Sequence, residues 1–386
     1  MKSVKWYRMK KYLLLLVVLM TTCCSKPNEL AKIQFTPELI IGEDIETEGA
    51  WFSTLNDFWV DEQENMFCVD GGDRKIKVFD KNGKPVFCFG QKGQGPGEFS
   101  YPNGIAVSKA GNIYIADAGR RSLIKFDNTG KFIHSIQIGS PIAKIRMFDS
   151  GNIVLEIARF AVRKEIKESI FELAIYDANL KEVKTGIFEK PVENYAWINV
   201  SKEHIVTQQI PFAPKIVWHI IGNQLYVGYT DEFKISVFDE SGNYVKNFSK
   251  NVDREKVTGD EKNKWIERKL KNFKDRPGFV PEIMKESLEK VNLPSLKPAF
   301  TVLGEMDNGL IVFGNPGESE FPATLFDKED IEVGQAIFEF DNFKYFNGKY
   351  YRIITEDEEP AVLVRYPGAA KLKKNNYPQR SQRKSI

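Results

Sequence analysis

The residues best suited to hold a charged ligand are arginines and acids that follow short β-type segments. Arginines follow these segments in the first half of the chain, and carboxylates follow them in the second half. We predict a ligand-binding set of Arg74, Arg120, Arg121, Arg159, Asp231 and Glu318. A guanidinium group binds carboxylates and anionic sugars through paired hydrogen bonds, so the basic half favours an anionic partner. The alternative is that these loops are only a solvated surface.

Other residue combinations could carry catalysis, but none has the spacing that catalysis requires. His134, His204 and His219 occupy different positions in the repeat described below, which disfavours a shared metal site. Glu156 and Asp231 could hold a divalent ion such as Ca²⁺ in a metal-assisted lactonase or lyase, but no motif surrounds them. There is no Ser-His-Asp order and no nucleophile elbow. We therefore expect no cofactor and favour a binding protein over an enzyme.

Two further features are interpreted as turns. The segment from Gly93 to Gly97 resembles a phosphate loop in composition, but no helix follows it and Pro96 interrupts it. Asp70 and Asp117 end equivalent strands and recur with the repeat. We predict that each carboxylate accepts hydrogen bonds from the amides of its turn, and that a metal role is the weaker alternative.

The positions of these residues depend on a phrase that occurs six times, an aromatic and acidic strand end followed by a turn. The clear copies are VFDKNG at 78–83, KFDNTG at 125–130, IYDANL at 175–180 and VFDESG at 237–242. Weaker copies are LFDKED at 325–330 and VRYPGA at 364–369. A second phrase, GNIYIAD in its clearest form, precedes each copy. Two phrases in register define six supersecondary units.

Each unit can be divided into four short strands. In the second unit the apolar runs are Asn103–Val107, Ile113–Ala116, Leu123–Phe126 and Phe132–Ile136, separated by Gly, Asn, Asp and Ser. Hairpin-linked strands without intervening helices exclude a parallel α/β sheet. Most repeat steps fall near the roughly 40–50 residues of a four-stranded blade. We therefore predict an all-β, six-bladed β-propeller of four-stranded antiparallel blades.

Two repeat steps are longer and must contain insertions. The step from Tyr176 to Phe238 is 62 residues, and Tyr195–Gln209 predicts an extra hairpin within it. The step from Phe238 to Phe326 is 88 residues. Its apolar residues at helical spacing predict two helices, in an insertion over about residues 253–292 between blades four and five. The helix-spaced residues are Ile266, Leu270 and Phe273, and then Met284, Leu288 and Val291.

The last unit has only three predicted strands. These are Ala336–Phe340, Tyr350–Thr355 and Ala361–Arg365. We expect the fourth strand to come from the beginning of the chain, from either Ile33–Phe35 or Leu39–Ile41. A blade built from both ends of the chain would close the ring.

The ends of the chain predict segments outside the propeller, which we place at residues 25–370. Residues 1–24 combine five basic residues with a short apolar run and predict a lipoprotein signal peptide. The sequence LMTTCCSK resembles a lipobox, with Cys24 or Cys23 as the lipidated residue. Residues 371–386 are basic, contain no acid, and are expected to be disordered.

The net charge and the cysteine content further limit the classes of function that the chain can have. The net charge of +2 becomes −3 without the five basic residues of the signal peptide, and −9 without the six of the tail. An acidic core of this kind disfavours nucleic-acid binding. Cys68 and Cys88 both fall in the first unit, and we expect two buried free thiols rather than a disulfide.

The segment GQKGQGPGEFSYPNGIAVSKAGNIYIADAGRRSLIKFDNTGKFI resembles NHL-repeat sequence through its GPGEF, YPNGIAV, GNIYIAD and FDNTGK elements. With the lipobox and the helical insertion, the chain is similar to six-bladed β-propeller lipoproteins of Gram-negative bacteria. The resemblance implies the fold and an outer membrane lipoprotein, periplasmic or surface-exposed, but no activity. We expect a monomer that binds or scaffolds a protein or glycan on its loops, with the metal-assisted enzyme as the alternative.

Overall fold

The computed structural model describes residues 30–368 except 45, 48, 164–165, 193, 308, 318–319 and 356–359. The predicted signal peptide, its two cysteines and the basic tail lie outside the described residues. The propeller belongs to one compact unit that begins at Lys32. Among the described helices, none is both long and apolar enough to cross a membrane.

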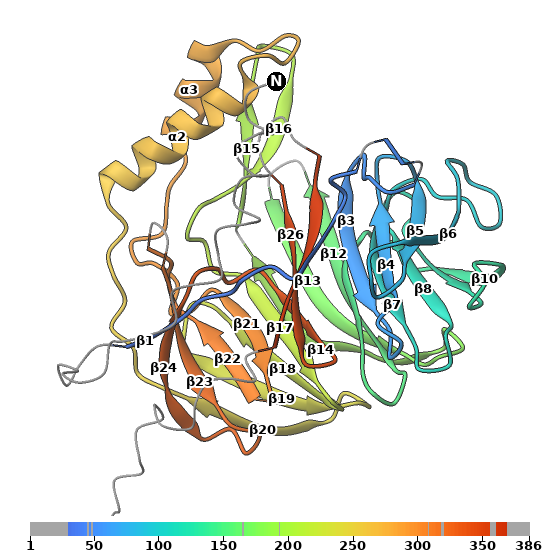
Figure 1. Cartoon of the computed structure of the whole chain (residues 1–386). Helices are drawn as coiled ribbons and strands as arrows, with labels where there is room; N and C mark the ends of the chain where they lie inside the picture. The colour runs from blue at the N-terminus through green and yellow to red at the C-terminus, as the bar shows by residue number, and fades with distance from the viewer. Residues whose placement is uncertain are drawn as a thin grey trace, which may run out of the picture. The chain divides into compact units, whose positions relative to one another are not determined.

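Six antiparallel sheets form the blades of a propeller, as predicted (Figure 1). Blades one and two contain β3 (Leu55–Val60), β4 (Met66–Asp70), β5 (Lys75–Phe79) and β6 (Pro85–Phe89), then β7 (Pro102–Val107), β8 (Ile113–Asp117), β9 (Ser122–Phe126) and β10 (Phe132–Gln137). Blades three and four contain β11 (Ile142–Met147), β12 (Ile153–Arg163), β13 (Ile166–Tyr176) and β14 (Glu182–Val192), then β17 (Ile216–Ile221), β18 (Gln224–Tyr229), β19 (Lys234–Asp239) and β20 (Tyr244–Ser249). Blade five contains β21 (Val302–Met306), β22 (Gly309–Phe313), β23 (Phe321–Phe326) and β24 (Glu332–Phe338), and blade six contains β25 (Lys344–Phe346), β26 (Lys349–Ile354) and β27 (Val362–Tyr366).

The first strands of neighbouring blades contact one another and surround the axis of the ring. Every residue of the second strands β4, β8 and β22 is buried. The fourth strand of blade one, β6, alternates between half-buried and exposed residues, so its Val86 reaches solvent. Six hydrophobic clusters fill the spaces between adjacent blades. Burial of this apolar surface from water is the main force that holds the blades together.

The repeated acidic residue forms the turn between the third and fourth strands. In five blades its Oδ1 accepts hydrogen bonds from the backbone N–H groups two and four residues later. These residues are Asp80, Asp127, Asp177, Asp239 and Asp327. The turn then requires a left-handed backbone, which Gly83 adopts at φ 81° and Leu180 at φ 63°. The weaker copy LFDKED therefore makes the same turn as the clear ones.

The N-terminal segment closes the ring. Strand β2 (Leu39–Ile41) pairs with β27 and supplies the fourth strand of blade six, which confirms the second of the two predicted candidates. Strand β1 (Ala31–Ile33) instead adds a fifth strand beside β24 of blade five. The assignment of Ala336–Phe340 to blade six was wrong, because Ala336 and Phe338 lie in β24 of blade five. The first strand of blade six is the three-residue β25, whose lysine made it a weak strand candidate.

Both predicted insertions are confirmed. The hairpin comprises β15 (Tyr195–Asn199) and β16 (Ile205–Gln209), and the helices are α2 (Gly259–Phe273) and α3 (Pro281–Glu289). Thr258 caps α2 in a capping box with Glu261. The two insertions share one hydrophobic cluster, in which Ile198 of the hairpin packs with helix residues including Met284 and Leu288. We call this unit of hairpin and helices the insert.

Candidate functional site

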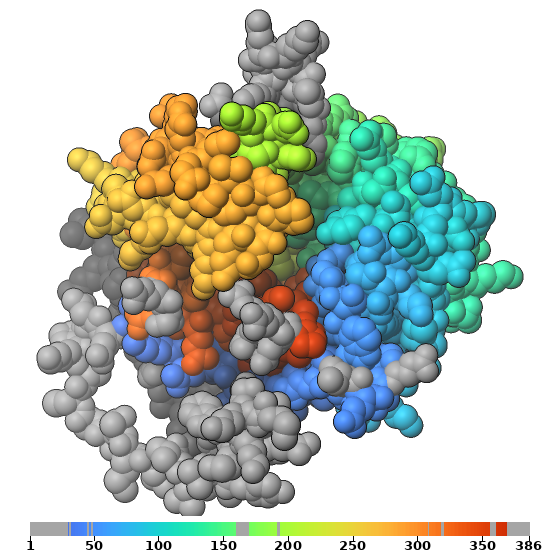
Figure 2. Space-filling view, turned by 90° about the horizontal axis from the view of Figure 1, so that it is seen from above, coloured from blue at the N-terminus to red at the C-terminus, as the bar shows by residue number. Residues whose placement is uncertain are grey.

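One face of the propeller, which we call the loop face, carries the connections between second and third strands and the connections between blades. Antiparallel order within a blade places these two kinds of connection at the same edge of each sheet. Both parts of the insert come from inter-blade connections, and they stand together at the top of Figure 1. Figure 2 looks onto this face, where the insert covers one sector and leaves the blue and cyan residues of blades one and two uncovered.

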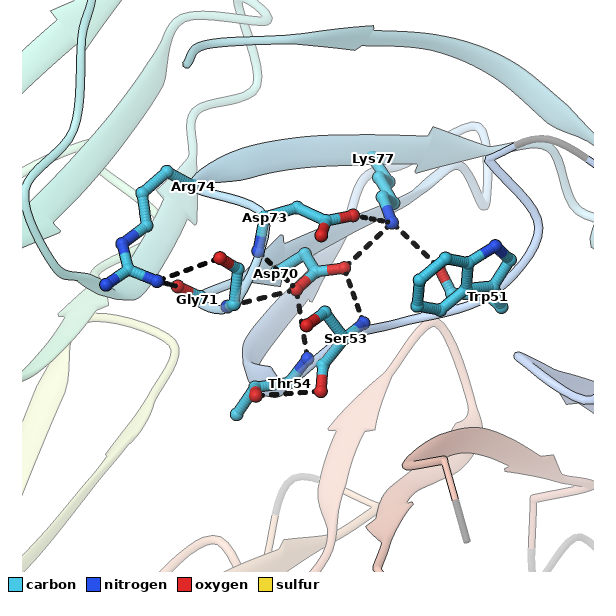
Figure 3. Close-up of polar contacts among 9 residues, drawn as sticks. Trp51, Ser53, Thr54, Asp70, Gly71, Asp73, Arg74 and Lys77 are labelled. Atoms are coloured by element: carbon cyan, nitrogen blue, oxygen red, sulfur yellow. Dashed lines mark hydrogen bonds and ion pairs between the residues drawn. The ribbon is translucent and has the colours of Figure 1, made fainter. Parts of the chain in front are cut away.

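Asp70 organises the loop of blade one (Figure 3). Its carboxylate accepts hydrogen bonds from the backbone N–H groups of Ser53 at 2.9 Å and Thr54 at 3.0 Å, and from two amides of its own turn. It also forms an ion pair with Lys77 at 2.8 Å. Asp117 accepts the equivalent amide hydrogens in blade two. The predicted role of both carboxylates in their turns is therefore confirmed.

Arg74 is directed onto backbone carbonyls rather than into solvent (Figure 3). Its Nη1 donates to the carbonyls of Gly71 and Gly72, the latter at 2.8 Å, and its Nε donates to the carbonyl of Ser100 at 3.0 Å. These bonds link the loop of blade one to the segment that enters blade two. A ligand would have to compete with these three hydrogen bonds for the Arg74 guanidinium group. A role for Arg74 in ligand binding stays a prediction.

In blade two the adjacent arginines Arg120 and Arg121 differ in position. Arg120 is half-buried and donates to the carbonyls of Gly95 at 2.9 Å and Glu98 at 2.7 Å. It therefore holds the glycine-rich segment, which forms an inter-blade turn. Arg121 has a left-handed backbone with φ 55° and is exposed. Its guanidinium has no hydrogen-bonded partner among the described residues, so it is free to contact a ligand.

The remaining predicted residues lie on blades three to five. Arg159 is 56% exposed and forms an ion pair at 2.5 Å with Glu172, which is buried. Asp231 is exposed, and its backbone carbonyl accepts a hydrogen bond from Arg254. Glu318 lies outside the described residues. The three predicted residues whose side chains the structure exposes are therefore Arg121, Arg159 and Asp231.

A second group of charged residues lies at the axis, and the sequence analysis missed most of it. Asp57 on β3 accepts hydrogen bonds from Arg146 on β11 at 3.1 Å, from the backbone N–H of Ile105 on β7 at 3.2 Å, and from Lys344 on β25. Lys344 also donates to the carbonyl of Phe58 at 2.6 Å. One carboxylate therefore joins blades one, two, three and six.

A neighbouring set joins blades three and four. Trp218 on β17 donates its indole N–H to Glu156 on β12 at 2.6 Å. The ammonium group of Lys144 on β11 lies 4.3 Å from the centre of the Trp218 ring and donates to the Trp218 carbonyl at 3.0 Å. Lys215 immediately precedes β17, the first strand of blade four, three residues before Trp218, and it acts electrostatically on both Lys144 and Glu156. We call Asp57, Lys144, Arg146, Glu156, Lys215 and Lys344 the axial cluster.

The axial cluster is partly removed from water, and its acid–base properties change accordingly. Exposure of the side chains is 19% for Arg146, 16% for Lys344 and 11% for Asp57. Burial and the positive charge of Arg146 lower the pKa of Lys144 and of Lys344 to about 7. Burial raises the pKa of Glu156. Burial acts to raise the pKa of Asp57 as well, but the charges of Lys344 and Arg146 hold it below its usual value.

The sequence contained one sign of this cluster. The segment IAKIRM of β11 carries Lys144 and Arg146 two residues apart, so both side chains point to the same side of a strand. Charges on an innermost strand conflict with the apolar content expected of a propeller interior. That conflict identifies an axial polar site once β11 is known to be innermost.

The residues considered for metal binding do not converge. Glu156 lies at the axis, whereas Asp231 lies on the loop face of blade four. His219 Nε2 lies 3.5 Å from Glu305 Oε2. His204 contacts the hydroxyl of Ser201 in the connection between β15 and β16. Within the described part of the chain, no three His, Cys, Asp or Glu side chains are grouped to hold a metal ion.

Cys68 and Cys88 are free thiols, as predicted. Cys68 is buried, and burial raises the pKa of its thiol. The prediction that Cys88 is also buried was wrong, because Cys88 lies on the outer strand β6, where alternate side chains face solvent.

Comparison with known proteins supports the fold. A family model described as 6-bladed beta-propeller matches residues 59–259. No curated protein matches the sequence. A putative exported protein from Bacteroides fragilis has 12% identity and a TM-score of 0.50, over 87% of this chain and 98% of that one. A member of the duf4221 family from Bacteroides vulgatus has 13% identity and a TM-score of 0.48, over 86% and 97% of the two chains. At 12% identity, the similarity to the Bacteroides fragilis protein shows the fold alone.

Proposed function

Because this chain belongs to the six-bladed β-propeller family whose model matches residues 59–259, we propose that it is a cell-envelope binding protein that holds a protein or glycan ligand on its loop face. The observation that best supports this function is the presence of the insert on the loop face. Two insertions from different inter-blade connections pack into one hydrophobic cluster on this face. The insert lies outside the six clusters that join the blades, so ring closure does not account for it.

The loops of blades one and two, which the insert leaves uncovered, are already ordered, which supports a binding role. Asp70 and Arg74 fix the loop of blade one, and Asp117 and Arg120 fix that of blade two. A preorganised surface loses less conformational entropy when a ligand binds. Arg121 and Arg159 then offer exposed guanidinium groups to anionic groups of the partner, and Asp231 offers a carboxylate on the other half.

Export and anchoring are part of the same proposal. The lipobox-like sequence favours an acyl chain on Cys24 or Cys23, and the similar protein from Bacteroides fragilis is described as exported. We place the protein at the outer membrane as a monomeric lipoprotein, periplasmic or surface-exposed, with NHL-like repeats. No observation on the described residues favours the metal-assisted lactonase or lyase.

Crosslinking and pull-down from the native cell envelope tests the loop face. The test variant is Arg121→Glu, which reverses an exposed charge on the loop face. Arg159 is left in place because it is the ion-pair partner of the buried Glu172. The matched control is Lys131→Glu, which reverses an exposed charge in the turn between the third and fourth strands of blade two, at the opposite edge of that blade.

We expect one partner to be recovered by the wild type and the control but lost from Arg121→Glu, with wild-type recovery falling as salt rises. Equal recovery by all three proteins would overturn the assignment of the partner to the basic half of the loop face. Recovery of no specific partner by the wild type would overturn the binding function itself.

A further inference from the structure

The axial cluster contains more cationic groups than its carboxylates can satisfy. Arg146 uses Nη1 for Asp57 and for the carbonyl of Ile145, while its Nε and Nη2 have no partner among the described residues. Lys144 has one hydrogen bond, to the carbonyl of Trp218. The ammonium group of Lys215 has no hydrogen bond within the described part of the chain. Several strong donors at the axis are therefore uncommitted.

The carboxylates nearby do not remove this imbalance. Asp57 already accepts from Arg146, Lys344 and a backbone amide. Glu156 accepts from the Trp218 indole, and its burial disfavours ionisation. Asp341, the other acid that acts on Lys215, also has a pKa raised by burial. Cations withdrawn from water are costly unless an anion or hydrogen-bond acceptors compensate them.

The cations also repel one another. Arg146 is the charge that most strongly lowers the pKa of both Lys144 and Lys344, and Lys144 acts on Lys344 in turn. They come from β11 of blade three and β25 of blade six. Asp57 already lies between Arg146 and Lys344, but no acid among the described residues accepts a hydrogen bond from Lys144 or Lys215. A further negatively charged group beside Lys144 and Arg146 would relieve the remaining repulsion and accept hydrogen bonds from their unused donors.

We propose that the axial cluster is a binding site for a small oxyanion, a carboxylate- or phosphate-bearing molecule, held by Lys144, Arg146 and Lys215. Arg146 supplies Nε and Nη2, which lie in the plane that matches two oxygens of a carboxylate or phosphate. Lys144 supplies the donors that the Trp218 carbonyl leaves unused. The proposal uses residues other than Arg121, Arg159 and Asp231 and does not depend on the binding of a protein or glycan by them.

Titration calorimetry with the full mature chain tests the site, with citrate and inorganic phosphate as separate probes at constant ionic strength. The variants are Lys144→Met and Lys215→Met, which keep most of the side-chain volume and remove the charge. The control is Lys125→Met. Lys125 resembles Lys144 in lying 5.6 Å from the centre of an aromatic ring, that of Tyr114, and in donating to a backbone carbonyl, but it is on β9 away from the axis.

We expect saturable binding of at least one probe, weakened about tenfold or more by each axial substitution and unchanged by Lys125→Met. The probe that binds more tightly distinguishes a carboxylate ligand from a phosphate ligand. Binding of neither probe to the wild type would overturn the proposal. Equal weakening in the control would also overturn it. Lys215→Met keeps the test valid if Lys144→Met fails to fold.

Discussion

Lys344 on the innermost strand of the last blade donates a hydrogen bond to Asp57 on the innermost strand of the first blade, 287 residues away in the sequence. The same ammonium group lies 4.2 Å from the centre of the Phe58 ring. The ring is therefore closed twice. Strand β2 joins the ends of the chain at the rim through backbone hydrogen bonds, and Asp57 joins them at the axis through side chains.

Replacing Asp57 with Asn should destabilise the whole propeller. Asn retains the shape and can still accept from the amide of Ile105, but it leaves Arg146 and Lys344 without their negative partner. Breaking a buried pair in this way costs about 3–5 kcal/mol, and urea unfolding measures the loss. Glu332→Gln, in the more exposed pair with Lys250, should cost less than about 1 kcal/mol. Similar values for the two variants would refute the axial role of Asp57.

Lys144 should make the free energy of unfolding rise with pH. In the folded protein burial and Arg146 lower its pKa to about 7 from the usual 10.5, so between these values the unfolded chain binds a proton that the folded protein does not. Stability then increases with pH by about 1.4 kcal/mol per pH unit for this group. Denaturant unfolding from about pH 7.5 to about 9.5 should show this slope. Lys144→Met should reduce the slope of the free energy of unfolding against pH by about 1.4 kcal/mol per pH unit. An unchanged slope in the variant would contradict the assignment.

Strand β2 should be required for closure of the ring. Ile41 is buried between blades one and six, so Ile41→Ala should cost about 2–5 kcal/mol, and Leu39→Ala, at a half-buried position, should cost less. Deletion of residues 31–42 should lower the melting temperature much further, because it also removes Phe35 from its packing against Phe340 and Tyr366. A deletion variant that melts within about two degrees of the parent would rule out this closure.

The insert should unfold locally without the blades. Leu288 is fully buried in the cluster that the hairpin and helices share, so Leu288→Ala should destabilise that cluster by about 2–5 kcal/mol. Limited proteolysis should then cut within residues 256–292 while the thermal transition of the blades stays in place. Leu270→Ala, at the half-buried edge of the same cluster, should have a weaker effect. A shift of the main transition by Leu288→Ala would show that the insert is part of the propeller core.

Acylation at the lipobox-like sequence should anchor the protein to membranes. Replacing both Cys23 and Cys24 with Ser should move the protein from the washed membrane fraction to the soluble fraction, because no thiol remains to carry an acyl chain. The two single variants identify which cysteine is modified. Retention of the double variant in membranes would indicate a different anchor.

Much of the fold could be predicted from the sequence because its determinants are local. In five blades the repeated Asp after the third strand accepts hydrogen bonds from the amides two and four residues later, so the turn is encoded within six residues. The helices of the insert follow from apolar spacing and from the capping signals at Thr258 and Pro281. Strand β25 was missed, and Ala336–Phe340 was assigned to blade six in its place, because a three-residue strand with one lysine carries almost no local pattern.

The chemistry at the axis and on the loop face depended on contacts between distant residues. The sequence predicted the loops that carry Arg74, Arg120 and Arg121, but only the structure distinguished the two that bond backbone carbonyls from the one that is exposed. Asp57, Arg146 and Lys344 belong to three blades, and they meet only because the closed ring brings its first strands around one axis. By itself the sequence determined the repeat, the turns and the number of blades, which follow from short-range hydrogen bonding and apolar periodicity. Tertiary structure decided which charges converge, because that depends on ring closure between residues nearly 300 positions apart.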